Sequence, residues 1–466
     1  MRPRTLLLLA ALAGLTACSV GTPYQRPALD VPAEFRGEPV RPTGRTFGEL
    51  DWWEVYQDPA LRQLMETALA HNRDLQLAAA RMAEAGALVG QARTAQWPQL
   101  GLSLSGQRGR VVQNSGYVTG ALFNGGADAS YELDIWRRLA SLTDAARANL
   151  LATQAGRDAV QVGLMAAVAT AYFTLLSLDQ QAAITTRAIA NRERFFDLTR
   201  RMARRGASSD LDVDRAQASL AQARAVLPDL RRQVEQTENQ LQILLGNNPA
   251  PIARQGDDEL PALPQVPAGL PSSLLERRPD LIQAEAVLAG ANANVNAAKA
   301  SLFPAITLTA SYGSESFELS KLFSGPTKVW MVGLDLLQPI INAQRNRYAV
   351  NAAGAREQQA LLQYQSAVAE AFRQVADALA ARRNSVDLIA AQQQQVDALR
   401  GAQSLVTRRY EVGRSSYFEV IDADASLLTA ELQLAQARRS GLLASVQLYQ
   451  ALGGGWNPRR APAAGP

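Results

Sequence analysis

The 466-residue sequence contains only one cysteine, Cys18, and only one histidine, His71. A single cysteine excludes an internal disulfide. One cysteine and one histidine are also too few for a His/Cys metal site or a Cys/His nucleophile arrangement. No G-x-x-x-x-G-K-[ST] loop occurs, so we expect no nucleotide hydrolysis. We therefore predict a protein that is not an enzyme and holds no cofactor, with His71 as a solvated residue at a helix end.

The sequence also lacks a strong excess of one charge and a long apolar run. Lys and Arg number 47 against 43 Asp and Glu, which gives no reason to expect a nucleic-acid partner. After the first residues, no run approaches the ~20 consecutive apolar residues of a transmembrane helix. If the chain crosses a membrane, we expect it to do so with strands.

The N-terminus has the anatomy of an export signal. Arg2 and Arg4 precede an apolar stretch and then small residues, which predicts a signal peptide over residues 1–17. Its removal would lower the formal net charge from +4 to +2, because these arginines are its only charges. Cys18 ends "LTAC", which resembles the lipobox of bacterial lipoproteins, whose cysteine is acylated with lipid such as palmitate. The alternative is a chance cysteine in the signal of a soluble exported protein.

One stretch of the sequence occurs twice. "GASSDLDVDRAQASLA" at 206–221 and "GRSSYFEVIDADASLL" at 413–428 are identical at eight of sixteen positions. "WPQLGLSLSG" at 97–106 corresponds to "FPAITLTASY" at 303–312 with nearly the same offset. A period of about 200 residues exceeds solenoid repeats of ~20 to 50, so we predict a duplicated half-protein. Each half reads as a moderate helix, two strands, a very long helix, a turn and a returning helix.

The strands are recognised by alternation. Residues 100–105 and 306–311 alternate apolar with small polar side chains, and second strands are expected near 128–135 and 329–336. Their lengths suit membrane strands of ~9 to 11 residues, although such alternation is also typical of a soluble sandwich. We expect the glycine-rich "GALFNGG" at 120–126 in a loop between strands.

Four strands are too few to span a membrane alone. About eight are needed to close a barrel, and each unsatisfied backbone group at an open edge in lipid costs several kcal/mol. A membrane interpretation therefore requires an oligomer that pools its strands.

Two long helices are predicted at 139–205 and 343–412, which lack proline and would be on the order of 100 Å long. Gly206 and Gly413 follow arginines and suit left-handed helix ends. Apolar residues at heptad spacing are Leu164, Val168, Ala171, Leu175 and Leu178 in the first helix, and Val368, Phe372, Val375, Leu379 and Val386 in the second. Candidate N-caps of the returning helices are Ser208, Ser209, Ser415 and Ser416.

The chain divides by composition into six segments. "ERRPD" at 276–280 is expected to be a helix start with arginine pairing nearby acids, rather than an anion or catalytic site. The predicted divisions are the signal 1–17, an extended segment 18–58 with acylated Cys18, a first repeat 59–246, a proline-rich linker 247–271, a second repeat 272–456 and a tail 457–466.

These pieces together resemble the outer-membrane factor, or TolC-like, family, and in particular its NodT-type lipoprotein branch. The motifs that carry the resemblance are the lipobox followed by "VGTPYQRP", then "WWEVYQDPALRQLMETALAHNRDL", "LPSSLLERRPDL", "LFPAITLTASYG", "QPIINAQRNR", "YEVGRSSYFEVIDADASLLTAELQLAQARR" and "ALGGGW". They occur in this order over essentially the whole chain.

The resemblance implies an α+β membrane protein that forms a homotrimer. Each protomer would give four strands to a twelve-stranded barrel in the outer membrane, continued by an α-helical barrel across the periplasm. The implied function is the exit duct of a tripartite efflux pump, passively conducting small hydrophobic or amphipathic compounds such as antibiotics. The implied partners are outer-membrane lipid, a periplasmic adaptor and an inner-membrane pump of the resistance-nodulation-division type.

The resemblance also implies a gate at the periplasmic tip. Asp422 and Glu419 match acidic positions of the family, which in three copies would attract cations, and Phe418 matches an apolar constriction. Asp212 and Tyr410 match the closing network, whereas Ser415 stands where the family has arginine and Arg414 is its neighbour. The alternative for these acids is a solvated helix N-terminus, which also favours carboxylates.

Two other functions remain open from the sequence. One is an exit duct for a polypeptide secreted by a type I, ATP-driven exporter. The other is a periplasmic coiled-coil scaffold lipoprotein, which would leave the alternating strands unexplained.

Overall fold

The computed structural model describes residues 20–29, 32, 36, 47, 50–113, 116–254, 260–264, 274–341 and 343–455. The expected signal peptide 1–17, Cys18 and the tail 457–466 lie outside the described residues. The chain forms two compact units. Unit 1 comprises residues 1–29, 80–155 and 282–366, and unit 2 comprises residues 30–79, 156–281 and 367–466.

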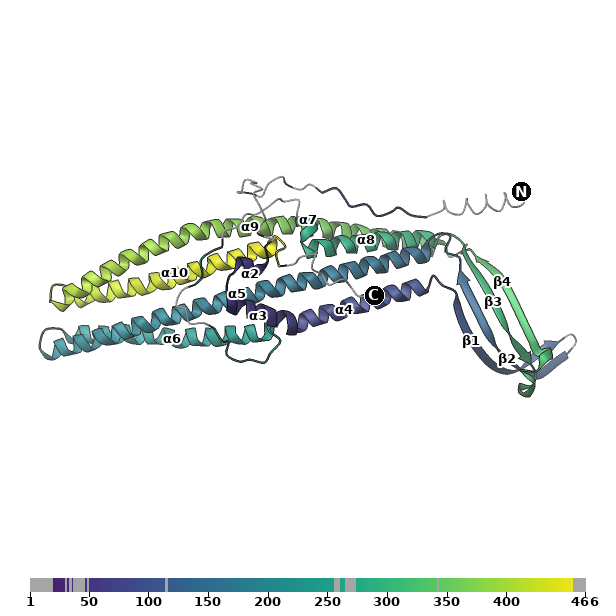
Figure 1. Ribbon diagram of the computed structural model, residues 1–466, viewed down its shortest axis with the longest axis horizontal. Coiled ribbons are helices and arrows are strands. Elements are labelled where there is room, and N and C mark those ends of the chain that lie inside the picture. Colours follow the sequence, from purple (N-terminus) through teal and green to yellow (C-terminus); the bar gives the residue numbers. More distant parts are fainter. Residues whose placement is uncertain are drawn as a thin grey trace. The chain divides into compact units, whose positions relative to one another are not determined.

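Unit 1 contains a single antiparallel sheet of four strands in the order β1-β2-β3-β4, which lie side by side in Figure 1. The strands are β1 (Gln99–Gln113), β2 (Gly116–Glu132), β3 (Ala305–Ser316) and β4 (Lys328–Leu337). Each half of the sequence contributes one strand hairpin, as the repeat predicts. Among the described residues, β1 and β4 each have a strand partner on one side only, so both edges of the sheet are open.

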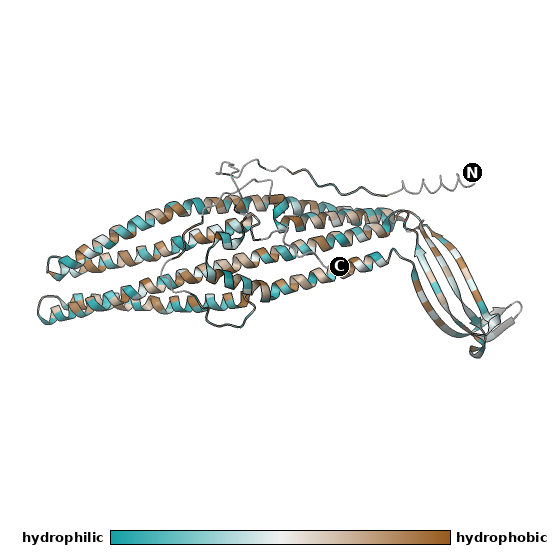
Figure 2. Cartoon of the chain, viewed as in Figure 1, coloured by the Kyte–Doolittle hydropathy of each residue, from teal (hydrophilic) through white to brown (hydrophobic). Residues whose placement is uncertain are grey.

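The two faces of the sheet differ in chemistry. Residues directly opposite in an antiparallel pair share a face, so Leu102, Ala127, Tyr312 and Trp330 lie in one row. We call this the apolar face; Leu102 is 90% exposed and Trp330 75% exposed on it. The opposite, polar face carries alternating residues such as Ser103. Figure 2 shows the resulting alternation of hydrophobic and hydrophilic residues along the strands.

The first strand hairpin is longer than expected, and the glycine-rich segment 120–126 is not a loop. β1 has 15 residues and β2 has 17, and residues 120–126 lie within β2. Gly126 pairs with Gly313, and a Cβ at Gly126 would lie 2.8 Å from the Gly313 Cα. The expectation of a loop was wrong because glycine here permits close approach of two strands rather than a turn.

Side chains join the sheet to the adjoining helices of unit 1. Asp134 follows β2 and accepts hydrogen bonds from the backbone N–H groups of Leu139 and Ala140, at 3.0 and 2.7 Å. The Trp136 ring stacks on Phe303 at a centroid distance of 4.8 Å. The first turn of the long helix is therefore fixed directly after the strand.

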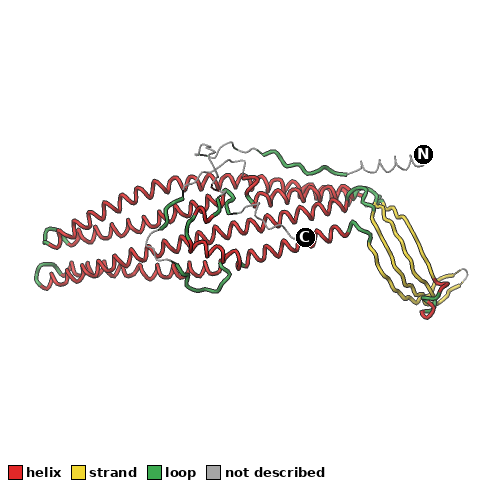
Figure 3. The backbone as a smooth tube through the Cα atoms, in the orientation of Figure 1, coloured by secondary structure: helices red, strands yellow, loops and turns green. Residues whose placement is uncertain are grey.

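The long helices and their returning partners form where the sequence predicts them. The two hairpins are drawn in Figure 3 as pairs of helices joined by short loops. The first is α5 (Arg138–Arg204) with α6 (Asp210–Leu244), and the second is α9 (Ala343–Glu411) with α10 (Tyr417–Ala451). The shorter helices are α2 (Trp52–Val55), α3 (Pro59–His71), α4 (Arg73–Thr94), α7 (Leu274–Arg277) and α8 (Pro279–Ala300).

The main core of unit 2 collects side chains from α2, α3, α5, α6, α7, α9 and α10. All five heptad residues predicted in α5, from Leu164 to Leu178, are buried. In α9, Val386 is 48% exposed, contrary to expectation, while Ser385 is buried. The buried series there passes through Ala378 and Ser385, seven residues apart, so the small side chain occupies the inward position.

One described helix is apolar enough by length and composition to cross a membrane. An 18-residue window of α5 has a mean hydropathy of 1.7, and half of that window is buried. The expectation that no stretch reaches this level was therefore wrong for α5. This is weak evidence for a span, because core helices pass the same test, and residues such as Val168 and Phe173 lie in the unit 2 core.

Three local expectations can be compared with the structure. His71 is exposed at the last residue of α3, as expected. Pro279 opens α8, and Arg278 pairs with Asp280 at 2.6 Å, so "ERRPD" is a helix start. In the described part of the segment 247–271, Arg254 forms ion pairs with α5 and α6.

Replacing Gly126 with valine tests the close approach of β2 and β3. The added side chain meets backbone atoms, so we expect Gly126→Val to lower the free energy of unfolding by about 1–3 kcal/mol. Gly120→Val is the control, because a Cβ at Gly120 of the same strand meets nothing within 4 Å. Thermal unfolding of the detergent-solubilised protein measures both; equal melting temperatures would contradict this account of Gly126.

Candidate functional site

The duplicated sequence forms the tips of the two helical hairpins. Gly206 and Gly413 both have φ of +73°, in the left-handed region that favours glycine. Their N–H groups donate to the carbonyls of Ala203 and Tyr410, each at 2.9 Å. Each long helix therefore ends two residues before its glycine, which confirms the turn predicted from the repeat.

The returning helices begin with serine caps. Ser209 and Ser416 each accept a hydrogen bond from the backbone N–H three residues on, at 3.2 and 3.4 Å. The Asp212 and Glu419 carboxylates accept hydrogen bonds from the backbone N–H groups of these serines, at 3.4 and 3.2 Å, which completes two capping boxes. Ser208 and Ser415 are not the caps: their hydroxyls donate to the same carboxylates, at 3.2 and 2.7 Å, but accept no hydrogen bond from a backbone N–H among the described residues.

Hydrogen bonding lowers the pKa of both capping carboxyls. The largest cause is the side-chain bond from Ser209 for Asp212 and from Ser415 for Glu419. A carboxyl whose pKa falls on folding stabilises the folded state above its unfolded pKa, and this contribution is lost as the pH falls through the folded pKa. The geometry thus favours the helix N-terminus interpretation for Glu419 and Asp212.

Asp422 and Phe418 are disposed differently from the capping acids. Asp422 is exposed and, among the residues that the structure describes, forms no hydrogen bond or ion pair. Phe418 is 60% exposed, and the Arg215 guanidinium lies 6.0 Å from its ring centroid. Asp422 and Arg215 occupy equivalent positions of the two repeats, so the duplicated tips carry opposite charges there.

Tyr410 lies in a buried cluster that joins the two hairpin tips. Its hydroxyl is 3.2 Å from the Thr199 hydroxyl on α5, and its ring packs against Tyr417 with centroids 5.5 Å apart. Burial raises the pKa of Tyr417 to about 12. Arg414, by contrast, is exposed in the turn, and its guanidinium has no partner among the described residues.

A buried ion pair near the tips was missed from the sequence. Arg192 Nε on α5 lies 2.7 Å from Asp424 Oδ2 on α10, with side chains 6% and 9% exposed. Arg192 also donates to the Ser219 carbonyl on α6, at 2.9 Å, so one guanidinium joins three helices. The repeat contained a signal for this pair. Arg192 corresponds to Leu399 and Asp424 corresponds to Gln217, so each charge occurs in only one copy of the repeat.

Two exposed ion pairs occupy equivalent places with their signs exchanged. Glu193 pairs with Arg224 at 2.6 Å in the first hairpin, and Arg400 pairs with Glu431 at 2.8 Å in the second. Both partners are offset by 207 residues between the copies. The duplicated halves therefore keep the contact but not the charges.

The described N-terminal segment 20–29 is held along α8 within unit 1. Arg26 forms a two-pronged ion pair with Glu285, with both N–O distances at 2.6 Å. Thr22 exchanges backbone hydrogen bonds with the Asn296 side chain at 2.9 and 3.2 Å. Since Arg26 meets residue 285 and Thr22 meets residue 296, the segment runs antiparallel to α8, and its N-terminal end points toward the α8–β3 junction.

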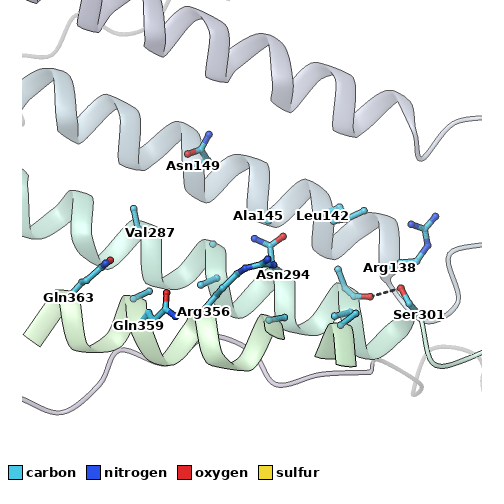
Figure 4. Close-up of a pocket in the computed structure, with 18 residues that line it drawn as sticks. Arg138, Leu142, Ala145, Asn149, Val287, Asn294, Ser301, Arg356, Gln359 and Gln363 are labelled. Carbon is cyan, nitrogen blue, oxygen red and sulfur yellow. Dashed lines mark hydrogen bonds between the residues drawn. The ribbon is translucent and has the colours of Figure 1, made fainter. Parts of the chain in front are cut away.

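A cavity of about 730 Å³ opens between α5, α8 and α9 in unit 1 (Figure 4). Alanines make up much of its lining, and Ser301 donates its hydroxyl to the Ala297 carbonyl at 3.1 Å. Arg138 at its edge pairs with Glu132 at 2.6 Å. The polar groups of the cavity do not converge on one point, so we place the candidate functional site at the hairpin tips.

Comparisons with known proteins agree with the duplicated architecture. The model of the family described as "Outer membrane efflux protein" matches residues 64–247 and 270–454. The antibiotic efflux pump outer membrane protein ArpC of Pseudomonas putida is 36% identical, covering 97% of this chain and 96% of that protein. The cation efflux system protein CusC of Escherichia coli O6:H1 is 33% identical, covering 98% and 100%. The solved structure of the outer-membrane channel OprN has a TM-score of 0.88 at 30% identity, covering 95% and 100%.

The buried pair Arg192–Asp424 gives a prediction about stability. Asp424→Leu leaves a buried guanidinium without its counter-charge, so we expect the free energy of unfolding to fall by about 3–5 kcal/mol. The double variant Arg192→Met/Asp424→Leu should recover most of that loss. Thermal unfolding measures both variants.

The control is Glu193→Ala in the neighbouring exposed pair, which should cost less than about 1 kcal/mol. If Asp424→Leu were no more harmful than this control, the pair would not be a determinant of tip stability.

Proposed function

We propose that this chain works as a passive duct formed by three copies of itself. The chain belongs to the outer membrane efflux protein family and is the outer-membrane component of an efflux pump. The expected family, the fold of duplicated halves with four antiparallel strands and long helices, and the location in the outer membrane are confirmed. The family is one of channels, so the expectation that the chain is not an enzyme is also confirmed.

The single observation that carries closure by further copies is the sheet with an exposed apolar face and two open edges. In hydrocarbon, unpaired backbone groups along β1 and β4 would each cost several kcal/mol. Pairing β4 of one copy with β1 of the next satisfies both edges and closes a barrel when the copies form a ring. Two copies would give eight strands, the practical minimum, and three give twelve; the number three is what the resemblance to the family implies.

The proposed cargo is a small hydrophobic or amphipathic compound, including antibiotics. The name of the relative ArpC supports this class. Energy would come from an inner-membrane pump of the resistance-nodulation-division type, reached through a periplasmic adaptor that meets the hairpin tips. Because the named relatives are efflux components, polypeptide secretion is not our proposal, and a scaffold would leave the apolar face of the sheet unexplained.

We place the gate at the tips, with Asp422 as its charged group and Phe418 as its apolar group. Three Asp422 carboxylates would attract cations and disfavour anions at the narrowest point. Tyr410 would hold the two hairpins of a protomer together, since it joins α9 to α5. Asp212 and Glu419 would support the gate by capping the helices, and Arg414 remains available to the turn or to a partner.

The lipid anchor and the chain divisions are also proposals. Acylated Cys18 would lie only four residues before Thr22, about 13 Å of extended chain. The segment 20–29 points toward the α8–β3 junction. A lipid on Cys18 would therefore insert into the inner leaflet of the outer membrane, beside the sheet. We also propose the six segments given above, from the signal 1–17 to the tail 457–466, as the divisions of the chain.

Replacing Asp422 tests the gate. We expect Asp422→Ala to raise single-channel conductance in planar bilayers and to weaken the preference for cations, because a ring of three charges is removed. The control is Asp229→Ala, an exposed aspartate on α6 that pairs with Arg232 away from the tip. Unchanged conductance and selectivity for Asp422→Ala in trimers shown to conduct would remove Asp422 from the gate.

Replacing Cys18 separates the anchor from the strands. Cys18→Ser should abolish incorporation of a labelled palmitate analogue, while the mature protein should still need detergent for release from membranes. The strand sheet supplies that second attachment. Release by salt or buffer alone would support the scaffold hypothesis, and continued labelling would place the acylation elsewhere.

A further inference from the structure

The charged residues of the sheet are segregated by face. The register assigns Arg108, Arg110 and Lys328 to the apolar face, which carries no acid among the strand residues that the structure describes. On the same strands the polar face carries no base, and its acids are Asp128, Glu132, Glu315 and Asp335. A random placement of charges would mix the signs, so each face has its own electrostatic partner.

The two arginines lie at the end of the sheet remote from its helices, and Lys328 lies at the same end of its own, shorter strand. Along β1, Leu100, Leu102 and Leu104 come first after α4, and Arg108 follows Leu104 by four residues, about 14 Å along the strand. Lys328 is the first residue of β4, and the register places it in the row of Leu104, Gly125 and Ser314, about four residues nearer the helices than Arg108. Since the helices extend into the periplasm in this family, the two arginines lie toward the external side of the membrane, and the long stem of Lys328 can carry its ammonium toward the same level.

Aromatic side chains mark the boundary between the leucine rows and the two arginines. Phe123 lies opposite Gly106 on the apolar face, between Leu104 and Arg108 along the pair. A Cβ on Gly125 would lie 3.8 Å from the Phe323 ring, which is itself 81% exposed. Aromatic rings are typical of the level at which hydrocarbon gives way to headgroups, so the bases reach the headgroup layer.

We propose that Arg108, Arg110 and Lys328 form a binding site for the phosphate groups of lipids in the outer leaflet. Phosphate accepts charge-assisted hydrogen bonds from guanidinium and ammonium groups, and the apolar face below supplies contact for the acyl chains. Arg108 and Lys328 are exposed and form no ion pair with any residue that the structure describes, so both can receive such a partner.

The site is completed by the neighbouring copy, and in this respect it depends on the trimeric duct proposed above. Arg108 and Arg110 stand on one edge strand and Lys328 on the other. Pairing β4 of one protomer with β1 of the next brings these bases onto adjacent strands. Each of three seams then carries two arginines from one protomer and one lysine from the next.

The occupant is a lipid rather than a free anion or a protein. The bases share their face with exposed leucines and Trp330, which a free phosphate would leave uncovered in the membrane. A phosphorylated lipid matches both features of this surface, an apolar band and a basic rim. Such a lipid would also stabilise the seam between protomers.

The test compares the affinity of the purified trimer for two forms of one lipid by native mass spectrometry in detergent. The probes are lipid A carrying both phosphates and lipid A from which both have been removed. Each base near an anionic headgroup contributes about a factor of five, so the wild type should prefer the phosphorylated form by roughly 100-fold. The triple variant Arg108→Gln/Arg110→Gln/Lys328→Gln should lose that preference.

The matched control is Arg93→Gln/Lys321→Gln/Arg345→Gln, which removes three exposed bases outside the strands and changes the net charge equally. It should keep the preference, and millimolar inorganic phosphate should not displace the lipid. An unchanged preference in the Arg108 triple variant, or full displacement by free phosphate, would overturn the proposal.

Mass and conductance of the same preparations distinguish this inference from the duct itself. Trimers that conduct but show no phosphate preference overturn only the lipid site. Preparations that neither form trimers nor conduct overturn the proposed function, and the seam site with it.

Discussion

The structure depends on one constraint: backbone N–H and C=O groups at a sheet edge need partners in a medium without water. With four strands and two open edges, a single chain cannot meet that requirement in the outer membrane. The exposed apolar face of the same sheet cannot stay in water either, so the two features point to the same solution, closure by further copies. The segregation of bases and acids between the two faces agrees with the proposed placement, in which one face would meet lipid headgroups and the other the lumen.

At the hairpin tips, the duplication fixes the backbone and leaves the side chains free to diverge. Both copies keep the left-handed glycine, the serine cap and the capping carboxylate, because these form the turn itself. The positions just beyond differ: Arg215 corresponds to Asp422, and Glu193 with Arg224 corresponds to Arg400 with Glu431. The chain thus has two kinds of tip, and only one carries the exposed aspartate and phenylalanine of the proposed gate.

The sequence predicted best what local chemistry determines. Glycine and serine at the turns and apolar heptads in the long helices predicted the helical hairpins within about a residue. Alternation located all four strands but missed most of β2, which begins at Gly116 and ends at Glu132 rather than spanning 128–135. The sequence-based prediction failed where packing between distant segments decides a residue's place. Gly126 lies in a strand because Gly313 approaches it, and Val386 points outward because Ser385 takes the buried position. The Arg192–Asp424 pair was missed because its partners are 232 residues apart and neither belongs to a motif.

The number of chains in the detergent-extracted particle tests the central claim most directly. Multi-angle light scattering of the eluting complex, with the detergent contribution subtracted, gives the protein mass without assuming a shape. The account predicts three chains, because closure of the sheet edges requires further copies and the resemblance to the family implies that three sheets of four strands close one barrel. A folded particle with the mass of one chain would contradict it, since its two open edges would then have to be tolerated within the membrane.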